Sequence, residues 1–154
     1  MSFVFEHDVR PVAYVYAGPG AGERSVASAV EALRTAVQPA VQVKTLVASD
    51  LLAGDWASGC CVLVMPGGAD LPYCRDLNGQ GNRLIRAYVE GGGAYLGLCA
   101  GAYYACQGIE FEMGSRLQVA GERELAFFPG CAKGGIYASF DYTRGKPARW
   151  RELA

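Results

Sequence analysis

The residues best suited to chemistry surround one cysteine, in the segment Gly97-Leu-Cys99-Ala-Gly101. An apolar run precedes this segment and a small-residue helical pattern follows it, which predicts a buried strand, a sharp turn at Cys99 and a helix. Glycines on both sides let the backbone pass closely around a nucleophile held in a strained conformation. A thiol at such a turn lies at the start of a helix, where partial positive charge favours the thiolate. We therefore expect Cys99 to have φ above zero and an accessible sulfur. The alternative is that Gly97 and Gly101 only let a helix pack on the sheet, with Cys99 as a small buried hydrophobic residue.

The expected thiol has no obvious base. Cysteine hydrolases deprotonate their thiol with a neighbouring histidine, and the single histidine, His7, precedes the first predicted strand. A carboxylic acid is the next candidate. Glu23 follows the first glycine-rich turn and, when protonated, can donate a hydrogen bond to a Cys99 thiolate. The other interpretation is that Glu23 complements the dipole at the start of its helix.

Two more glycine-rich turns are expected beside the cysteine, at residues 18–22 and 67–68. The carboxyl ends of parallel strands meet at one edge of a sheet, where ligands bind. Backbone N–H groups at that edge can hold an anion or a developing oxyanion, although glycines can also simply close tight turns. The first turn lacks the dinucleotide-binding spacing and contains a proline without an N–H. The candidate binding residues in these turns are Gly18, Gly20, Gly67 and Gly68.

Other side chains near these turns have two interpretations each. Asp70 can touch a ligand or cap the helix after the third strand. The hydroxyls of Tyr73, Tyr103 and Tyr104 can line the mouth of a pocket, but we favour core packing for one of the last two. Surface positions are favoured for three basic residues that can otherwise bring positive charge over the pocket, namely Arg123, Lys133 and Arg144.

The elements that position these residues alternate between strands and helices. Apolar positions spaced three and four apart predict helices at residues 23–37 and about 81–90, and a short helix capped at residues 49–50 runs to residue 52. Continuous apolar runs are typical of strands buried on both faces. Such alternation predicts an α/β fold, a parallel sheet with helices on both faces. Its strands are predicted at residues 11–17, 41–47, 60–65 and just before Cys99, and short strands of an antiparallel extension at 109–111, 125–128, 136–142 and 148–150.

Length and composition limit the classes of function. The chain of 154 residues is expected to form a single domain, residues 1–154. Its net charge is −1 and it has no basic cluster, which argues against nucleic-acid partners. It has neither an apolar run long enough to span a membrane nor a secretory signal, so we expect a soluble cytoplasmic protein. Six cysteines without a Cys-x-x-Cys pair, and one histidine, predict free thiols, no metal and no cofactor. Hydrophobic residues make up 51% of the chain, which makes a homodimer plausible.

Several segments, taken in order, resemble the N-terminal domain family of eukaryotic biotin–protein ligases, which also has free-standing bacterial members. The likeness runs from Val12 to the C-terminus, and its specific block is Gly-Gly-Ala-Asp-Leu-Pro-Tyr at residues 67–73. The cysteine turn alone is similar to the wider class I glutamine amidotransferase-like superfamily. The resemblance implies a flavodoxin-like fold, Cys99 in the nucleophile position, and an oxyanion pocket formed by the Gly67–Gly68 turn and the Ala100 amide. The matching segments are residues 18–20, 66–73, 97–104, 110–111 and 127–130.

The resemblance does not imply every activity of these families. Biotin ligation resides in a separate catalytic domain, and the amidotransferase triad needs a His-x-Glu after the cysteine, where this chain has no histidine. The chain is also expected to end before the family's last strands. Three functions remain open: a domain that binds an unknown small molecule or peptide beside Cys99, a Cys99-dependent hydrolase or carbonyl- or oxidant-processing enzyme, and a regulatory or assembly module.

Overall fold

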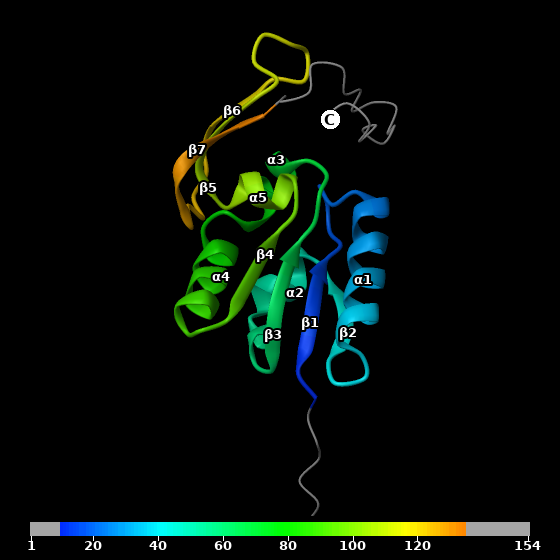
Figure 1. The fold of residues 1–154 in the computed structure, drawn as a ribbon. Coiled ribbons are helices and arrows are strands. Elements are labelled where there is room, and N and C mark those ends of the chain that lie inside the picture. Colours follow the sequence, from blue (N-terminus) through cyan, green and yellow to red (C-terminus); the bar gives the residue numbers. More distant parts are fainter. Residues whose placement is uncertain (1–9, 135–154) are drawn as a thin grey trace, which may run out of the picture.

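A computed structural model describes residues 10–134 of the chain, and its main element is a parallel sheet of four strands (Figure 1). The order is β2-β1-β3-β4, with each neighbouring pair parallel. The predicted α/β fold with a parallel sheet is therefore confirmed. The bounds of the strands are β1 Val12–Tyr16, β2 Gln42–Leu46, β3 Cys60–Met65 and β4 Ala94–Gly97.

Helices cover both faces of this sheet, as expected. Helix α1 (Glu23–Val37) has the bounds that its apolar stripe predicted, and its Ala29 packs with Val15 and Val64 on one face. The opposite face holds the larger core, in which Trp56 and Tyr88 pack against each other with ring centroids 4.9 Å apart. That core is built by α2 (Ala48–Ala53), a short 3-10 helix (Asp55–Ala57), α3 (Asp70–Leu77) and α4 (Gln80–Glu90).

A second sheet of three strands extends beyond the carboxyl ends of the main strands, beside α3 and α5 (Ala100–Tyr104) (Figure 1). Its order is β6-β5-β7, with β5 (Cys106–Phe111) antiparallel to β6 (Val119–Glu122) and parallel to β7 (Phe128–Gly134). The expected antiparallel extension is thus a mixed sheet. The strand predicted at 109–111 is part of β5, whereas those predicted at 136–142 and 148–150 lie outside the described residues.

The strand predicted at residues 125–128 was wrong. Leu125 is fully buried in the core and Ala126 has φ 43, so this apolar segment anchors the connection between β6 and β7 instead of pairing along its length. Only Phe128 belongs to a strand, as the first residue of β7. The strand that pairs with β5 on the other side is β6, which the sequence analysis missed.

The β6–β7 connection is fixed to the main body by one buried ion pair and by hydrogen bonds at or near the surface. Arg123 donates from Nε to Asp70 Oδ2 at 2.6 Å, with both side chains buried. Arg86 donates to the carbonyls of Glu124 and Leu125 at 2.9 and 2.7 Å. These contacts hold the second sheet next to the start of α3.

Among residues 10–134, no helix combines the length and the apolar character that crossing a bilayer requires.

Candidate functional site

Cys99 lies between β4 and α5 with φ 49 and ψ −109, and the residue is exposed. Both sequence predictions for this residue, a positive φ and an accessible position, are therefore confirmed. The turn is tied to the end of β3, because the Leu98 amide donates to the Met65 carbonyl at 2.9 Å. A side chain at Gly101 would overlap that same carbonyl, so this glycine is needed for α5 to pack on β3. The close packing offered as the alternative is thus present together with an exposed thiol.

The two other glycine-rich turns form one wall beside this cysteine. The Gly22 amide donates to the Gly67 carbonyl at 2.9 Å, and the Ala69 amide donates to the Gly20 carbonyl at 2.8 Å. Gly68 has φ 149, and a Cβ there would overlap the Gly20 carbonyl, so only glycine fits. The Gly68 amide lies outside the two hydrogen bonds of this bridge. The turns converge at the carboxyl edge of the sheet, as their positions after parallel strands predict.

Ser25 joins this wall to α1. Its Oγ accepts a hydrogen bond from the Gly67 amide at 2.8 Å. A Cβ built on Gly67 would lie 3.0 Å from Ser25 Oγ and 3.3 Å from Cys99 Cβ, so the two side chains border the same small space. Sequence reasoning missed Ser25. The signal that was present is a hydroxyl in the first turn of a helix that begins at this sheet edge.

Glu23, the sequence candidate for a thiol partner, is exposed in the first turn of α1. Among residues 10–134 its carboxylate makes no hydrogen bond or ion pair, with Cys99 or with any other group. Its place in the first helical turn is the one in which a negative charge complements the helix dipole. Ser25, two residues further along the same turn, is the residue of α1 that reaches the glycine wall.

Asp70 and Tyr73 face the interior. Asp70 is the first residue of α3 and makes the buried ion pair with Arg123, so it neither caps the helix through its side chain nor opens onto the Cys99 turn. The surface position favoured for Arg123 was accordingly wrong. Tyr73 is fully buried and its ring packs against Tyr16 and Tyr104, with centroids 5.3 and 5.6 Å away. It therefore does not line a pocket mouth.

Tyr73 nevertheless helps to fix the position of the turns around Cys99. Its hydroxyl donates to the Pro66 carbonyl at 3.0 Å, and the Gly101 amide donates to the same oxygen at 3.2 Å. The β3–α3 turn and the start of α5 are thereby held to each other through one carbonyl.

Of the two tyrosines that follow the cysteine turn, Tyr104 packs in the core, while the half-buried Tyr103 lies against Phe111 of β5 with ring centroids 5.7 Å apart.

The six cysteines fall into two groups by exposure. Cys99, Cys61 and Cys131 are exposed. Burial raises the pKa of the thiols of Cys60, Cys74 and Cys106. All six are free thiols, and the described part of the chain contains no group of three histidine, cysteine, aspartate or glutamate side chains placed to hold a metal ion.

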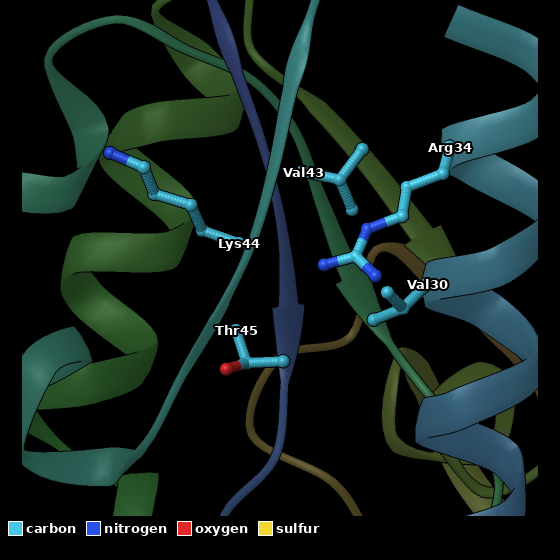
Figure 2. Close-up of a pocket in the computed structure, with 5 residues that line it drawn as sticks. All are labelled: Val30, Arg34, Val43, Lys44 and Thr45. Atoms are coloured by element: carbon cyan, nitrogen blue, oxygen red, sulfur yellow. The ribbon is translucent and has the colours of Figure 1, made fainter. Parts of the chain in front are cut away.

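A groove of about 380 Å³ lies elsewhere, where α1 passes beside β2 (Figure 2). Arg34 extends from α1 over this groove, whereas Lys44 points to the other side of β2. None of the predicted site residues lines it. Since β2 and β4 are the two outer strands of the main sheet, the groove is separate from the Cys99 turn. Its lining residues are Val30, Arg34, Val43, Lys44 and Thr45.

Comparison with known proteins adds family information to this geometry. The family model described as "Biotin-protein ligase, N terminal" matches residues 12–154. The chain is 38% identical over 136 residues to a protein named biotin–protein ligase from Schizosaccharomyces pombe, covering 88% of this chain and 22% of that protein. It is 51% identical over 90 residues to an uncharacterized protein from Chlamydia muridarum, covering 57% of this chain and 34% of the relative. The chain thus spans about a fifth to a third of the length of these relatives.

Proposed function

The chain belongs to the biotin–protein ligase N-terminal family, and on that premise we propose that it binds a small molecule or peptide beside Cys99. The observation that carries the proposal is an exposed cysteine with φ 49 that lies next to two glycine-rich turns, residues 18–22 and 67–68, which are hydrogen-bonded to each other. Ala100 is the first residue of α5, and amides in the first turn of a helix have no acceptor within it. The Ala100 and Gly68 amides are the backbone donors that we assign to the bound group.

Binding without a complete triad is the function that the surroundings of the thiol support best. Among residues 10–134, no histidine, aspartate or glutamate is hydrogen-bonded to Cys99. Amide hydrolysis by a cysteine relies on a base that takes the thiol proton and returns it to the leaving group. We also assign no biotin ligation to this chain, because it corresponds to 22% of the relative named for that activity.

The test combines protection of the thiol with a search for turnover. The full chain is labelled with iodoacetamide in the presence of free biotin, biocytin or L-glutamine, and Cys99 modification is followed by peptide mass spectrometry. We expect at least one probe to slow Cys99 modification without slowing that of the exposed Cys61, which serves as the internal control. If Cys99 is modified as fast with each probe at millimolar concentration as it is without a probe, the proposed binding of a small molecule beside Cys99 is contradicted.

A Cys99-dependent hydrolase is the second candidate, favoured by the Ala100 amide directly after the cysteine and by the Gly67–Gly68 turn beside it. Such pairs of donors stabilise the negative oxygen of acyl-transfer intermediates. Release of ammonia from L-glutamine by the wild type, and its loss in Cys99→Ser, would replace binding by hydrolysis as the function. We expect no release above that of the Cys99→Ser variant.

A further inference from the structure

The Ser25 hydroxyl accepts one hydrogen bond and donates none within residues 10–134. A serine hydroxyl donates one hydrogen bond and accepts up to two, and Ser25 Oγ accepts one from the Gly67 amide at 2.8 Å. Serines in helices often donate to the carbonyl of the preceding turn. Within residues 10–134, Ser25 donates to no group. Its proton is therefore available to an acceptor outside the described chain.

No side chain separates this hydroxyl from Cys99, because residue 67 is a glycine. A Cβ on Gly67 would fall 3.0 Å from Ser25 Oγ and 3.3 Å from Cys99 Cβ, closer than side chains usually pack. The exposed Cys99 and the half-buried Ser25 therefore lie on either side of the Gly67 backbone position. A group bound next to the cysteine therefore comes within reach of the serine.

The hydrogen bond from the Gly67 amide to Ser25 Oγ also changes which groups can donate to a bound oxygen. The resemblance implied an oxyanion pocket formed by the Gly67–Gly68 turn and the Ala100 amide, but the Gly67 amide of that turn is already bound to Ser25. We propose that Ser25 is a binding residue of the Cys99 site, which donates its O–H to an acceptor oxygen of the bound group in place of the Gly67 N–H. This inference rests on the proposed function, and it narrows the ligand class to groups that place an oxygen next to the sulfur.

Two small electrophiles of similar size test this role. Acrylamide and acrylonitrile both add to a thiolate: a C–S bond forms, the C=C pair shifts toward the activating group, and the α-carbon then takes a proton from water. In acrylamide the developing negative charge lies on a carbonyl oxygen, whereas in acrylonitrile it lies on nitrogen. A hydroxyl placed for oxygen should therefore favour acrylamide.

The measured quantity is the ratio of the acrylamide rate to the acrylonitrile rate at Cys99, followed by peptide mass spectrometry in the full chain. We expect Ser25→Ala to lower this ratio by roughly two- to tenfold, the worth of one net hydrogen bond. Ser25→Thr, which keeps the hydroxyl, should retain the wild-type ratio. Ser28→Ala is the matched control, because Ser28 is an exposed serine one turn further along α1.

The outcomes separate this inference from the proposed function. An unchanged ratio in Ser25→Ala overturns the role of Ser25, even if both rates fall, because a structural defect slows both reagents alike. That result leaves the binding site itself standing, since wild-type Cys99 still reacts. Failure of wild-type Cys99 to react with acrylonitrile would instead refute the accessible site and this inference with it.

Discussion

Replacing Arg123 by methionine should destabilise the domain strongly, because it leaves the Asp70 carboxylate buried without its partner. The two side chains are 4% and 9% exposed and their contact is 2.6 Å long. Removing one partner of a buried ion pair typically costs about 3–5 kcal/mol. With a urea m-value of about 1–3 kcal/mol per M, the midpoint of unfolding should fall by roughly 1–5 M.

The same change at an exposed pair provides the control. Lys133 contacts Glu110 at 2.7 Å in the same small sheet, but those side chains are 71% and 43% exposed. Lys133→Met should therefore shift the urea midpoint far less than Arg123→Met does, because solvent screens an exposed ion pair.

Both variants are compared with the wild type by urea unfolding of the full chain, followed by circular dichroism. A double variant, Asp70→Leu with Arg123→Met, removes both buried charges and should recover much of the loss. The reasoning is refuted if Arg123→Met shifts the midpoint no more than Lys133→Met does.

Three further predictions concern the glycine wall, the buried thiols and an anchoring carboxylate. Gly68→Ala should destabilise the domain by more than about 2 kcal/mol, since its Cβ overlaps the Gly20 carbonyl at φ 149; unfolding at the wild-type urea midpoint would count against this. Because burial raises the pKa of their thiols, Cys74 and Cys106 should label with iodoacetamide in the folded protein only when the pH exceeds the pKa of free cysteine, about 8.5. If either cysteine labels as fast as Cys61 at neutral pH, this prediction is contradicted. The Gly79 amide lowers the pKa of Glu124 in the folded protein, with a further contribution from Asn82. The Glu124 carboxylate therefore stabilises the folded protein fully above the unfolded-state pKa of about 4.3. This stabilisation is lost as the pH falls through the lower pKa of the folded state. Glu124→Gln should therefore make the free energy of unfolding depend less on pH below about pH 4.3. The same pH dependence in the variant and the wild type would contradict this role of the Glu124 carboxylate.

Local patterns predicted the elements that position the thiol. The apolar stripe of α1 identified both ends of that helix, because a helix covering one sheet face must repeat apolar residues every three or four positions. The cysteine turn was predictable because strand, glycines and helix agree over a few neighbouring residues. The convergence of residues 18–22 with 67–68 followed from the rule that parallel strands bring their carboxyl ends to one edge.

Interactions between distant residues could not be predicted in the same way. Arg123 and Asp70 are 53 positions apart, and a charged residue in a sequence is ordinarily placed at the surface. The role of Ser25 depends on the distance between α1 and the β3–α3 turn, which no local pattern encodes. Residues 119–122 carry little β-propensity, and β6 forms because β5 offers an edge for pairing. The buried Leu125 produced an apolar signal that indicated burial and not a strand.

The central claim is that Cys99 presents a reactive, solvent-accessible sulfur at the edge of the sheet. It is tested most directly by iodoacetamide labelling of the native full chain, compared site by site with the same chain in urea. At neutral pH we expect Cys99 to label in the native state, while Cys106 labels readily only after unfolding. Protection of Cys99 in the native protein as complete as that of Cys106 would contradict the site and the function proposed for it.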